Sequence, residues 1–271
     1  MHTPVLLQQA IENLHVKPGG LYIDATYGEG GYTKEILRLG GRVLAIDLDP
    51  RQISSSNIKD EKLTISTGNF ADIESIAKEK GFVQVDGVVF DLGLSMGQLE
   101  AGGRGLSYNK SDEDLDMRIG NEGEIRASDL LMNLKENELY EVLARGSEEI
   151  KSREIAREIK SGKKITKVGE LLKAIDRAVG FQSRTVYARI FQALRIEVNH
   201  EFENLKKGLQ GAANLIKRDG RIVVVTFHSL ESRIVKNFGK THGFKSSKRT
   251  SVQENLRIFE RSAKIRVLSY E

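Results

Sequence analysis

The stretch IDATYGEGGYTKEILRLGGRVLAIDLDP, from Ile23 to Pro50, decides the fold. A short apolar strand leads into a glycine-rich turn, a helix follows, and a second apolar strand ends in an acidic residue. Strands that alternate with helices in this way indicate βαβ units and a parallel sheet. Because open sheets of this kind bind ligands outside the carboxyl ends of their strands, the turn and the acid are candidate ligand contacts.

The glycine turn favours an anionic group but does not fit a dinucleotide. Gly28, Gly30 and Gly31 allow positive φ angles and close approach of a ligand, and the next helix directs its amide dipoles at the same point. The dinucleotide fingerprint G-x-G-x-x-G requires a third glycine where this chain has Thr33, which weighs against NAD or FAD. The alternative is a turn with only a structural role.

Asp47 ends the second strand, where a carboxylate can accept hydrogen bonds from a ribose diol. Together with the turn, it favours S-adenosylmethionine (SAM), which has a ribose and an amino-acid end but no pyrophosphate. The alternative role for Asp47 is the N-cap of the next helix. Asp49, directly before Pro50, suits that role better.

The rest of the chain divides into strand-containing and purely helical parts. Strands are expected at 21–25 and 42–47, which are the two strands of the opening stretch, and further on at 63–67, 87–91, 221–226 and 265–268. Helices are expected between them, at 32–39, 50–59, 73–80 and 229–240. A turn-rich segment at 102–118 and helical periodicity from about 124 to 178 interrupt the pattern. We therefore predict an α/β fold with a mostly parallel sheet and an inserted helical subdomain, with boundaries 1–101 plus 181–271 and 102–180.

The composition is that of a soluble globular protein, with 39% apolar and 30% charged residues among 271. The absence of cysteine excludes disulfides and thiolate metal sites and suits a reducing, cytoplasmic location. The five histidines are dispersed, so no metal site is expected. No apolar run approaches the ~20 residues that a membrane helix needs. The net charge of +4 permits a polyanionic partner.

Seven motifs, in order, resemble the bacterial RsmH (MraW) family. They are HTPVLL, FDLGLSMGQLE, RGLSY, LDMR, ARIFQALRIEVNHE, FHSLESRIVK and RSAKIRV. The resemblance implies a Rossmann-like class I SAM-dependent methyltransferase, with a helical insert that recognises the substrate. It also implies methylation of the cytosine N4 amine in the P-site region of 16S ribosomal RNA, with the small ribosomal subunit as partner.

The resemblance further implies a set of SAM contacts in the glycine turn, at the ribose, near the adenine and around the fourth strand: Gly30, Gly31, Tyr32, Asp47, Phe70, Asp91 and Gln98. Two departures from the family pattern stand out. Tyr32 replaces the usual histidine, which preserves a backbone contact and leaves the side-chain role open. Met96 and Gly97 replace the usual serine and proline.

Two residues are candidates for the chemistry. The cytosine N4 amine must lose a proton as it is methylated, and Asp91, at a central strand end, is the leading candidate to accept it. The alternative is that Asp91 only holds SAM or loop amides. His228 is expected to contact the flipped base or its ribose; alternatively, Ser229 caps the next helix and His228 only packs.

Two further regions are candidates for contact with the substrate. A single helix is expected through ARIFQALRIEVNHEF, and Gln192, Arg195 and Asn199 share one of its faces, which either lines the cleft or is solvated. The segment from Lys240 to Arg266 holds eight Lys or Arg against two Glu, a density that suits phosphate neutralisation. Basic residues also occur in SGKKITK, at 161–167.

Three alternative functions remain open at this point. The first is a SAM-dependent amino-methyltransferase that acts on DNA or another RNA. The second is a catalytically weak ribosome-assembly factor, against which the intact Gly30, Asp47 and Asp91 argue. The third, an NAD oxidoreductase, is disfavoured by Thr33.

Overall fold

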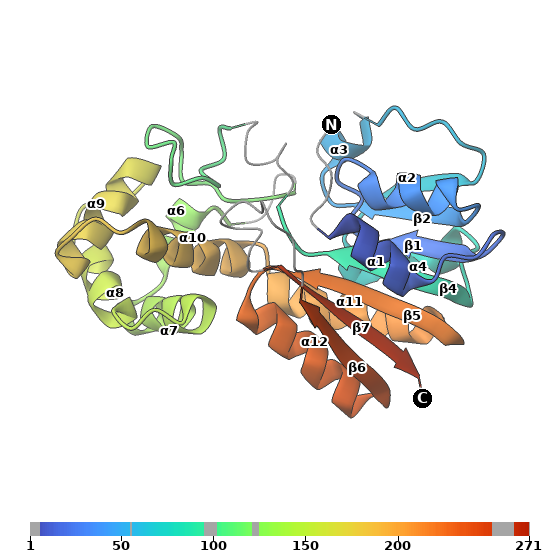
Figure 1. Cartoon of the computed structure of the whole chain (residues 1–271). Helices are drawn as coiled ribbons and strands as arrows, with labels where there is room; N and C mark the ends of the chain where they lie inside the picture. The colour runs from blue at the N-terminus through green and yellow to red at the C-terminus, as the bar shows by residue number, and fades with distance from the viewer. Residues whose placement is uncertain (1–5, 55, 95–101, 121–124, 251–262, 271) are drawn as a thin grey trace. The chain divides into compact units, whose positions relative to one another are not determined.

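A seven-stranded sheet forms the framework of the protein in this computed structural model, which describes residues 6–54, 56–94, 102–120, 125–250 and 263–270. Its strands are β1 Leu21–Asp24, β2 Arg42–Asp47, β3 Leu63–Thr67, β4 Val85–Asp91, β5 Ile216–Thr226, β6 Phe244–Thr250 and β7 Lys264–Tyr270. The order is β3-β2-β1-β4-β5-β7-β6, parallel from β3 to β5, with β7 antiparallel to both β5 and β6 (Figure 1). This is the class I methyltransferase arrangement, and it confirms the predicted fold class.

Successive residues of the central strands point to opposite faces of the sheet, and helices cover both faces. On β5, Ile222 and Val224 join one apolar cluster, while Val223 and Val225 join the other. The first cluster receives side chains from helices α4, α11 and α12, and the second from α1 and α2. Buried on both sides, these strands read as continuous apolar runs, as expected for parallel strands.

The helices that accompany the sheet have the following bounds: α1 Leu7–Leu14, α2 Gly31–Arg38, α3 Pro50–Ser54, α4 Ile73–Glu79, α11 Glu201–Leu215 and α12 Ser229–Thr241, with the 3₁₀ turn η1 at Phe70–Asp72. α3 is shorter than the predicted helix at 50–59 because the serine-rich sequence after it favours turns over helix. α12 lies alongside β6 and β7 (Figure 1).

The helical unit has its own apolar core, built from α6 Ala127–Asn133, α7 Glu136–Ser147, α8 Ser152–Ser161, α9 Val168–Val179 and α10 Arg184–Val198. The chain forms two compact units. The helical unit is Met96–Glu201, and the sheet unit combines Met1–Ser95 with Phe202–Glu271. The expected boundary at 180 therefore differs from the observed one, because α10 packs against α7 within the helical unit. Substrate recognition by this unit stays a prediction.

Two other elements differ from expectation. A single helix was predicted through ARIFQALRIEVNHEF, but α10 ends at Val198, Asn199 caps it, and His200 adopts a φ of +49° before α11 begins. β6, with the sequence FKSSKRT, has no apolar alternation and was not predicted. Such a charged sequence is typical of an edge strand, the position that β6 occupies.

Within the described part of the chain, no helix is both long and apolar enough to cross a membrane.

Candidate active site

The glycine turn between β1 and α2 needs glycine at two positions. Gly28 has a φ of +52° and Gly30, the N-cap of α2, a φ of +76°. A Cβ atom at Gly30 would lie 2.8–2.9 Å from the side chains of Ile58 and Tyr27, so that no larger residue fits. The Gly28 N–H donates to Asp47 Oδ2 at 2.7 Å and ties the turn to the end of β2.

Thr33, which occupies the place of the third glycine of a dinucleotide fingerprint, is fully buried and bound to an acid. Its N–H and hydroxyl donate to Asp24 Oδ2 at 3.1 and 2.7 Å, and the Thr26 N–H donates to Asp24 Oδ1 at 3.4 Å. Burial raises the pKa of Asp24 to about 6, although these hydrogen bonds oppose the shift. Thr33 therefore fixes α2 against the end of β1 through a buried carboxyl group.

Asp47 lies at the end of β2, as predicted, and is 8% exposed. Besides Gly28, the Asp49 N–H donates to it, to Oδ1 at 2.8 Å. Burial raises the pKa of Asp47, against these two hydrogen bonds. Each carboxylate oxygen keeps a lone pair for a further donor. Asp49 accepts from the Arg51 N–H at the start of α3, at 3.1 Å, in line with the N-cap role expected for it; the contact of Asp47 with a ribose stays a prediction.

Asp91 ends β4, at the same edge of the sheet as Asp24 and Asp47. One oxygen of its carboxyl group has no hydrogen-bond donor among the described residues. Its N–H donates to Thr26 Oγ1 at 2.7 Å, and its carboxyl group is hydrogen-bonded by the Tyr32 hydroxyl and the Gly93 N–H. The residue keeps partial exposure, but Oδ1 is buried and has no hydrogen-bond partner among the described residues. Burial and the charges of Asp24 and Glu231 raise the pKa of Asp91 to about 7, although the hydrogen bonds from Gly93 and Tyr32 oppose the shift.

Tyr32 contributes its side chain as well as its backbone to this edge. It is 2% exposed, and burial raises the pKa of its hydroxyl well above the ordinary value. The hydroxyl therefore stays a donor to Asp91. The sequence left the role of this side chain open, since the family usually has histidine there.

His228 is the N-cap of α12, a role that the alternative reading of the sequence gave to Ser229. The Glu231 N–H donates to His228 Nδ1 at 3.4 Å, and Glu231 Oε2 accepts from the N–H groups of Phe227 and His228 at 2.8 and 3.3 Å. His228 Nε2 lies 3.0 Å from Glu231 Oε1 but outside hydrogen-bonding geometry, and is buried without a partner in the described part of the chain. Contact of His228 with a substrate stays a prediction.

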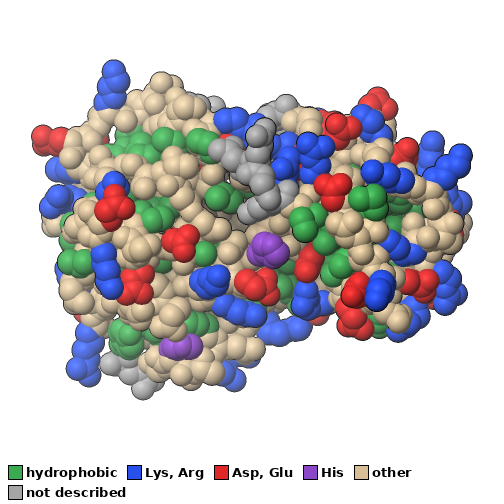
Figure 2. All heavy atoms as spheres, turned by 180° about the vertical axis from the view of Figure 1, so that it is seen from behind, with side chains coloured by type: hydrophobic (Ala, Val, Ile, Leu, Met, Phe, Trp, Pro, Cys, Tyr) green, Lys and Arg blue, Asp and Glu red, His purple; other side chains and the backbone are tan. Residues whose placement is uncertain are grey.

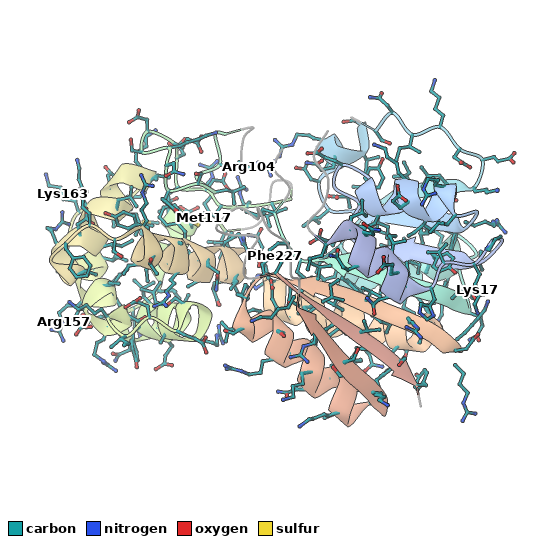
Figure 3. The ribbon with its side chains drawn as sticks, in the orientation of Figure 1. Lys17, Arg104, Met117, Arg157, Lys163 and Phe227 are labelled. Atoms are coloured by element: carbon teal, nitrogen blue, oxygen red, sulfur yellow. The ribbon has the colours of Figure 1, made fainter. Side chains whose placement is uncertain are left out.

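The neighbours of His228 order the loop that carries Asp91. Phe227, labelled in Figure 3, packs so closely on Gly93 that a Cβ there would lie 2.6 Å from its ring. The Gly93 N–H in turn holds the Asp91 carboxyl group. Phe70 begins η1 and packs edge-to-face on Phe90, with ring centroids 5.7 Å apart. Its contact with adenine stays a prediction, and Gln98 lies outside the described residues.

The polar face of α10 is used inside the helical unit. The Gln192 amide donates to Gly146 O at 3.0 Å, and the Arg195 guanidinium binds both oxygens of Glu201 at 2.7 and 3.0 Å. Asn199 accepts from the Ile119 N–H and donates to Met117 O, at 2.8 and 2.9 Å. These contacts account for the three polar side chains without a cleft or a ligand.

The LDMR motif forms the other half of that contact. Met117 is buried with a φ of +63°, and the Arg104 side chain donates to Arg118 O and Ile119 O at 3.0 and 2.6 Å (Figure 3). Asp116 binds the Arg118 guanidinium with both oxygens. The charged residues thus hold the loop together, and Asn199 binds its backbone to the end of α10.

A family model for the MraW methylase family matches residues 1–270. The chain belongs to this family. The chain is 38% identical to the ribosomal RNA small subunit methyltransferase H of Dictyoglomus thermophilum, over 98% of this chain and 96% of that protein. It is 41% identical to the protein of the same name from Clostridium botulinum, over 87% and 80%. A solved putative rRNA-methylase from Clostridium thermocellum matches with a TM-score of 0.48 at 14% identity, over 99% and 97%, too weakly to identify a function.

Membership of the family makes this chain a methyltransferase, and SAM is the methyl donor of this fold. The strand-end residues fit that cofactor. Asp24, Asp47 and Asp91 form no ion pair with Lys or Arg among the described residues, so that a cationic ligand meets uncompensated carboxyl groups. Asp91 Oδ1 lacks a donor, and Asp47 can accept further hydrogen bonds. No group of three or more possible metal ligands occurs within the described ranges.

Sequence reasoning missed two residues of this edge, Asp24 and Thr26. Thr26 joins β1 to β4 through Asp91, and Asp24 anchors α2. The signal was present in IDAT, where an acid follows an apolar strand as Asp47 does in AID.

Proposed function

We propose that this protein transfers a methyl group from SAM to the N4 amine of a cytidine in the P-site region of 16S ribosomal RNA. The names of the relatives support a small-subunit rRNA as the substrate. The observation that carries the chemistry is the buried, unpartnered Oδ1 of Asp91, at the strand end next to the glycine turn. The N4 position rests on the family resemblance and on this acceptor.

SAM supplies a methyl group activated by its sulfonium, and the residues of the strand ends hold it. We assign the glycine turn at Gly30 and Gly31 to its amino-acid end, Asp47 to its ribose and Phe70 to its adenine. The Gly30 turn is held in place by Gly28 and Asp47, and Asp47 is itself fixed by two backbone donors. Such fixed contacts place the methyl group without reorganisation in the reaction.

Asp91 acts on the amine. The N4 lone pair is conjugated into the cytosine ring, which makes the amine a poor nucleophile. A carboxylate that accepts one N4 hydrogen localises the lone pair as the methyl group arrives and then takes the proton. Burial of Oδ1 strengthens this hydrogen bond because few water dipoles screen it. The Tyr32 hydroxyl and the Gly93 N–H keep the carboxyl group oriented.

Charge is unevenly divided along the chain, and the C-terminal part is suited to RNA. Residues 202–271 contain fifteen Lys or Arg against six Asp or Glu, whereas residues 1–95 contain nine against thirteen. On α12, Arg233, Lys236 and Lys240 are exposed at spacings of three and four residues and therefore share one face, here called the basic face of α12. On the side shown in Figure 2, basic and acidic side chains are interspersed. We therefore place phosphate contact on the basic face of α12.

The reaction is tested with small subunits that lack the modification. The subunits are incubated with labelled SAM, and the label is mapped by digestion and nucleoside analysis. We expect N4-methylcytidine at a single P-site position, with poor methylation of a short RNA hairpin of the same sequence. A target base must be extruded to reach the cofactor, at a cost of a few kcal/mol. Label in a different nucleoside, or equal turnover on DNA, would contradict the proposal.

The RNA surface is tested by neutralising Arg233, Lys236 and Lys240 to Gln. We expect weaker binding of small subunits and a salt dependence reduced by about one unit per lost phosphate contact. The control replaces Lys59, Lys62 and Lys80, exposed residues near β3 and α4, and removes the same total charge. If both variants lose the same affinity, the net charge and not the basic face of α12 is responsible.

A further inference from the structure

Acidic side chains stand at the carboxyl ends of four consecutive strands. Asp47 ends β2, Asp24 ends β1, Asp91 ends β4, and Glu231 lies in the first turn of the helix that follows β5. Glu231 has His228 beside it and accepts two backbone N–H groups. Asp24 and Asp47 accept backbone and hydroxyl donors. Asp91 differs from the other three because Oδ1, in a buried position, has no donor within the described part of the chain.

The surroundings of Asp91 balance its two protonation states closely. Burial and the charges of Asp24 and Glu231 favour the protonated acid, while the Gly93 N–H and the Tyr32 hydroxyl favour the carboxylate. The result is a pKa of about 7, where a modest change in local charge decides whether the proton is bound. No Lys or Arg of the described chain pairs with Asp91, and a cationic ligand at the strand ends supplies a change of this kind.

We propose that Asp91, held by the Tyr32 hydroxyl, exchanges one proton for the positive charge of the cofactor. This inference rests on the proposed function only in that SAM occupies the strand ends. The sulfonium of SAM carries a positive charge that its demethylated product, S-adenosylhomocysteine, lacks. Binding of SAM therefore expels the proton from Asp91, and binding of the neutral product does not.

The exchange also balances the reaction. The N4 lone pair forms the new N–C bond, the C–S bond breaks with its electron pair going to sulfur, and the N4–H bond breaks with its proton going to Asp91 Oδ1. Before transfer, the site holds a carboxylate and a sulfonium; afterwards it holds a neutral acid and a neutral thioether. The buried site keeps the same net charge throughout, which avoids the cost of leaving an uncompensated charge out of water.

Tyr32 acts as a positioning residue in this exchange. Its hydroxyl donates to Asp91 and stabilises the carboxylate, so that removing it raises the pH at which the proton leaves. The hydroxyl cannot act as the competing base, because its own pKa lies well above 10. Histidine, the usual residue of the family at this position, brings a titrating group of its own and gives a different pH dependence.

The experiment is titration calorimetry of SAM and S-adenosylhomocysteine from pH 5.5 to 8.5, in buffers with different ionisation enthalpies. We expect SAM binding at pH 6 to release close to one proton, and the SAM affinity to rise by up to tenfold per pH unit until about pH 7 and then to level. S-adenosylhomocysteine binding should release none. In Asp91→Asn, SAM binding should release no proton, and the two ligands should no longer differ in proton release.

The Tyr32→Phe variant should keep the proton release but move its midpoint to higher pH. Tyr22→Phe is the matched control, because Tyr22 is also buried but accepts only from the Lys17 N–H and contacts His15 O at the other end of β1. If Tyr32→Phe does not fold, as judged by circular dichroism, Tyr32→His replaces it and should likewise shift the midpoint. An unchanged midpoint in the folded variants overturns the role of Tyr32.

The outcomes separate this inference from the proposed function. Proton release that persists in Asp91→Asn assigns the exchange to another group, such as Asp24, and overturns the inference while leaving the methyl transfer untouched. Equal, pH-independent affinities for both ligands do the same. Absence of any SAM binding contradicts the proposed function itself. Because calorimetry needs no RNA, the nature of the RNA substrate does not affect the result.

Discussion

The helical unit and the carboxyl edge of the sheet both hold acidic groups largely out of water, but Asp116 of the helical unit is paired with arginine, whereas Asp24 and Asp91 at the strand ends pair with no Lys or Arg of the described residues. Asp116 is bound by Arg118 with both oxygens and lies 3.7 Å from Arg126. Although burial alone would raise it, these contacts hold the pKa of Asp116 below its ordinary value. Asp24 and Asp91 have no such partner, and burial raises their pKa to about 6 and about 7. Asp116 therefore holds a loop through its ion pairs, whereas Asp24 anchors α2 without a cation and Asp91 keeps one oxygen for a ligand.

The strongest test of this contrast is the replacement of one acid from each region. Asp91→Asn keeps the shape but loses the charge and most of the proton affinity. We expect the rate of methyl transfer at saturating SAM to fall roughly 10²–10⁴-fold, the range for loss of a general base. Asp116→Asn, measured per folded molecule, should stay within a few-fold of the wild type. Single-turnover kinetics with excess SAM provide the comparison. Full recovery of the Asp91→Asn rate at high SAM would reduce Asp91 to a cofactor contact.

The same two acids should give the protein opposite dependences of stability on pH. The folded-state pKa of Asp91 is raised, so its stabilisation is complete below pH ~4 and is lost as pH rises through about 7. The free energy of unfolding of the wild type should therefore fall, relative to Asp91→Asn, by on the order of a few kcal/mol over this range.

For Asp116, whose pKa is lowered, the wild type should instead lose stability relative to Asp116→Asn as pH falls below ~4. Urea unfolding of each pair across pH, without SAM, measures both trends. A parallel pH dependence of wild type and Asp91→Asn between pH 4 and 7 would show that the Asp91 carboxyl group is not buried in the folded protein.

Asp47 tests whether the acids of the strand ends bind the cofactor. Each of its carboxylate oxygens accepts one backbone N–H and can accept a further donor from a ligand. Asp47→Ala removes charged hydrogen bonds worth ~1.5–3 kcal/mol each. We expect SAM affinity to fall about tenfold or more. Asp60→Ala is the control, since Asp60 accepts a backbone N–H in the same way but is exposed in a loop. Unchanged SAM affinity in folded Asp47→Ala would remove the ribose assignment.

The smallest effect on SAM binding is expected for the Asn199 side chain of the helical unit, whose amide is fully hydrogen-bonded within the chain. Asn199→Ala leaves the Ile119 N–H and Met117 O without partners and should destabilise that unit by about 1–3 kcal/mol. The loss should appear as faster hydrogen exchange at the amide of Ile119, with SAM affinity unchanged. Reduced SAM affinity in this variant would contradict the separation of roles between the two regions.

The fold was largely predictable because its signal is local. Continuous apolar runs such as those around Val88 and Val223 mark buried parallel strands, and the glycine turn marks the first strand-to-helix connection. The break after α10 was not predictable in this way. It depends on Asn199 bonding to Met117, 82 positions earlier in the chain, while the apolar periodicity continues through VNHEF without interruption.

The site was predictable to the level of individual strand ends but not of side-chain contacts. Asp47 and Asp91 follow apolar strands and were identified as acids of the ligand edge. The contact of Tyr32 with Asp91 joins α2 to β4 and leaves no trace in sequence spacing. His228 was read as a packed or substrate-contacting residue, although its N-cap role follows from a capping box that it forms with Glu231, three residues on.

The sheet order has a consequence for how the protein meets a polyanion. β1, β2 and β3, from the acidic residues 1–95, lie at one end of the sheet, and β5, β7 and β6, from the basic residues 202–271, lie at the other. The unit therefore carries an electric dipole along the strand order. In the field of an RNA surface such a dipole experiences a torque, which turns the β6 end towards the phosphates before contact. Encounters are thereby oriented as well as accelerated, an advantage that shrinks as ionic strength shortens the range of the field.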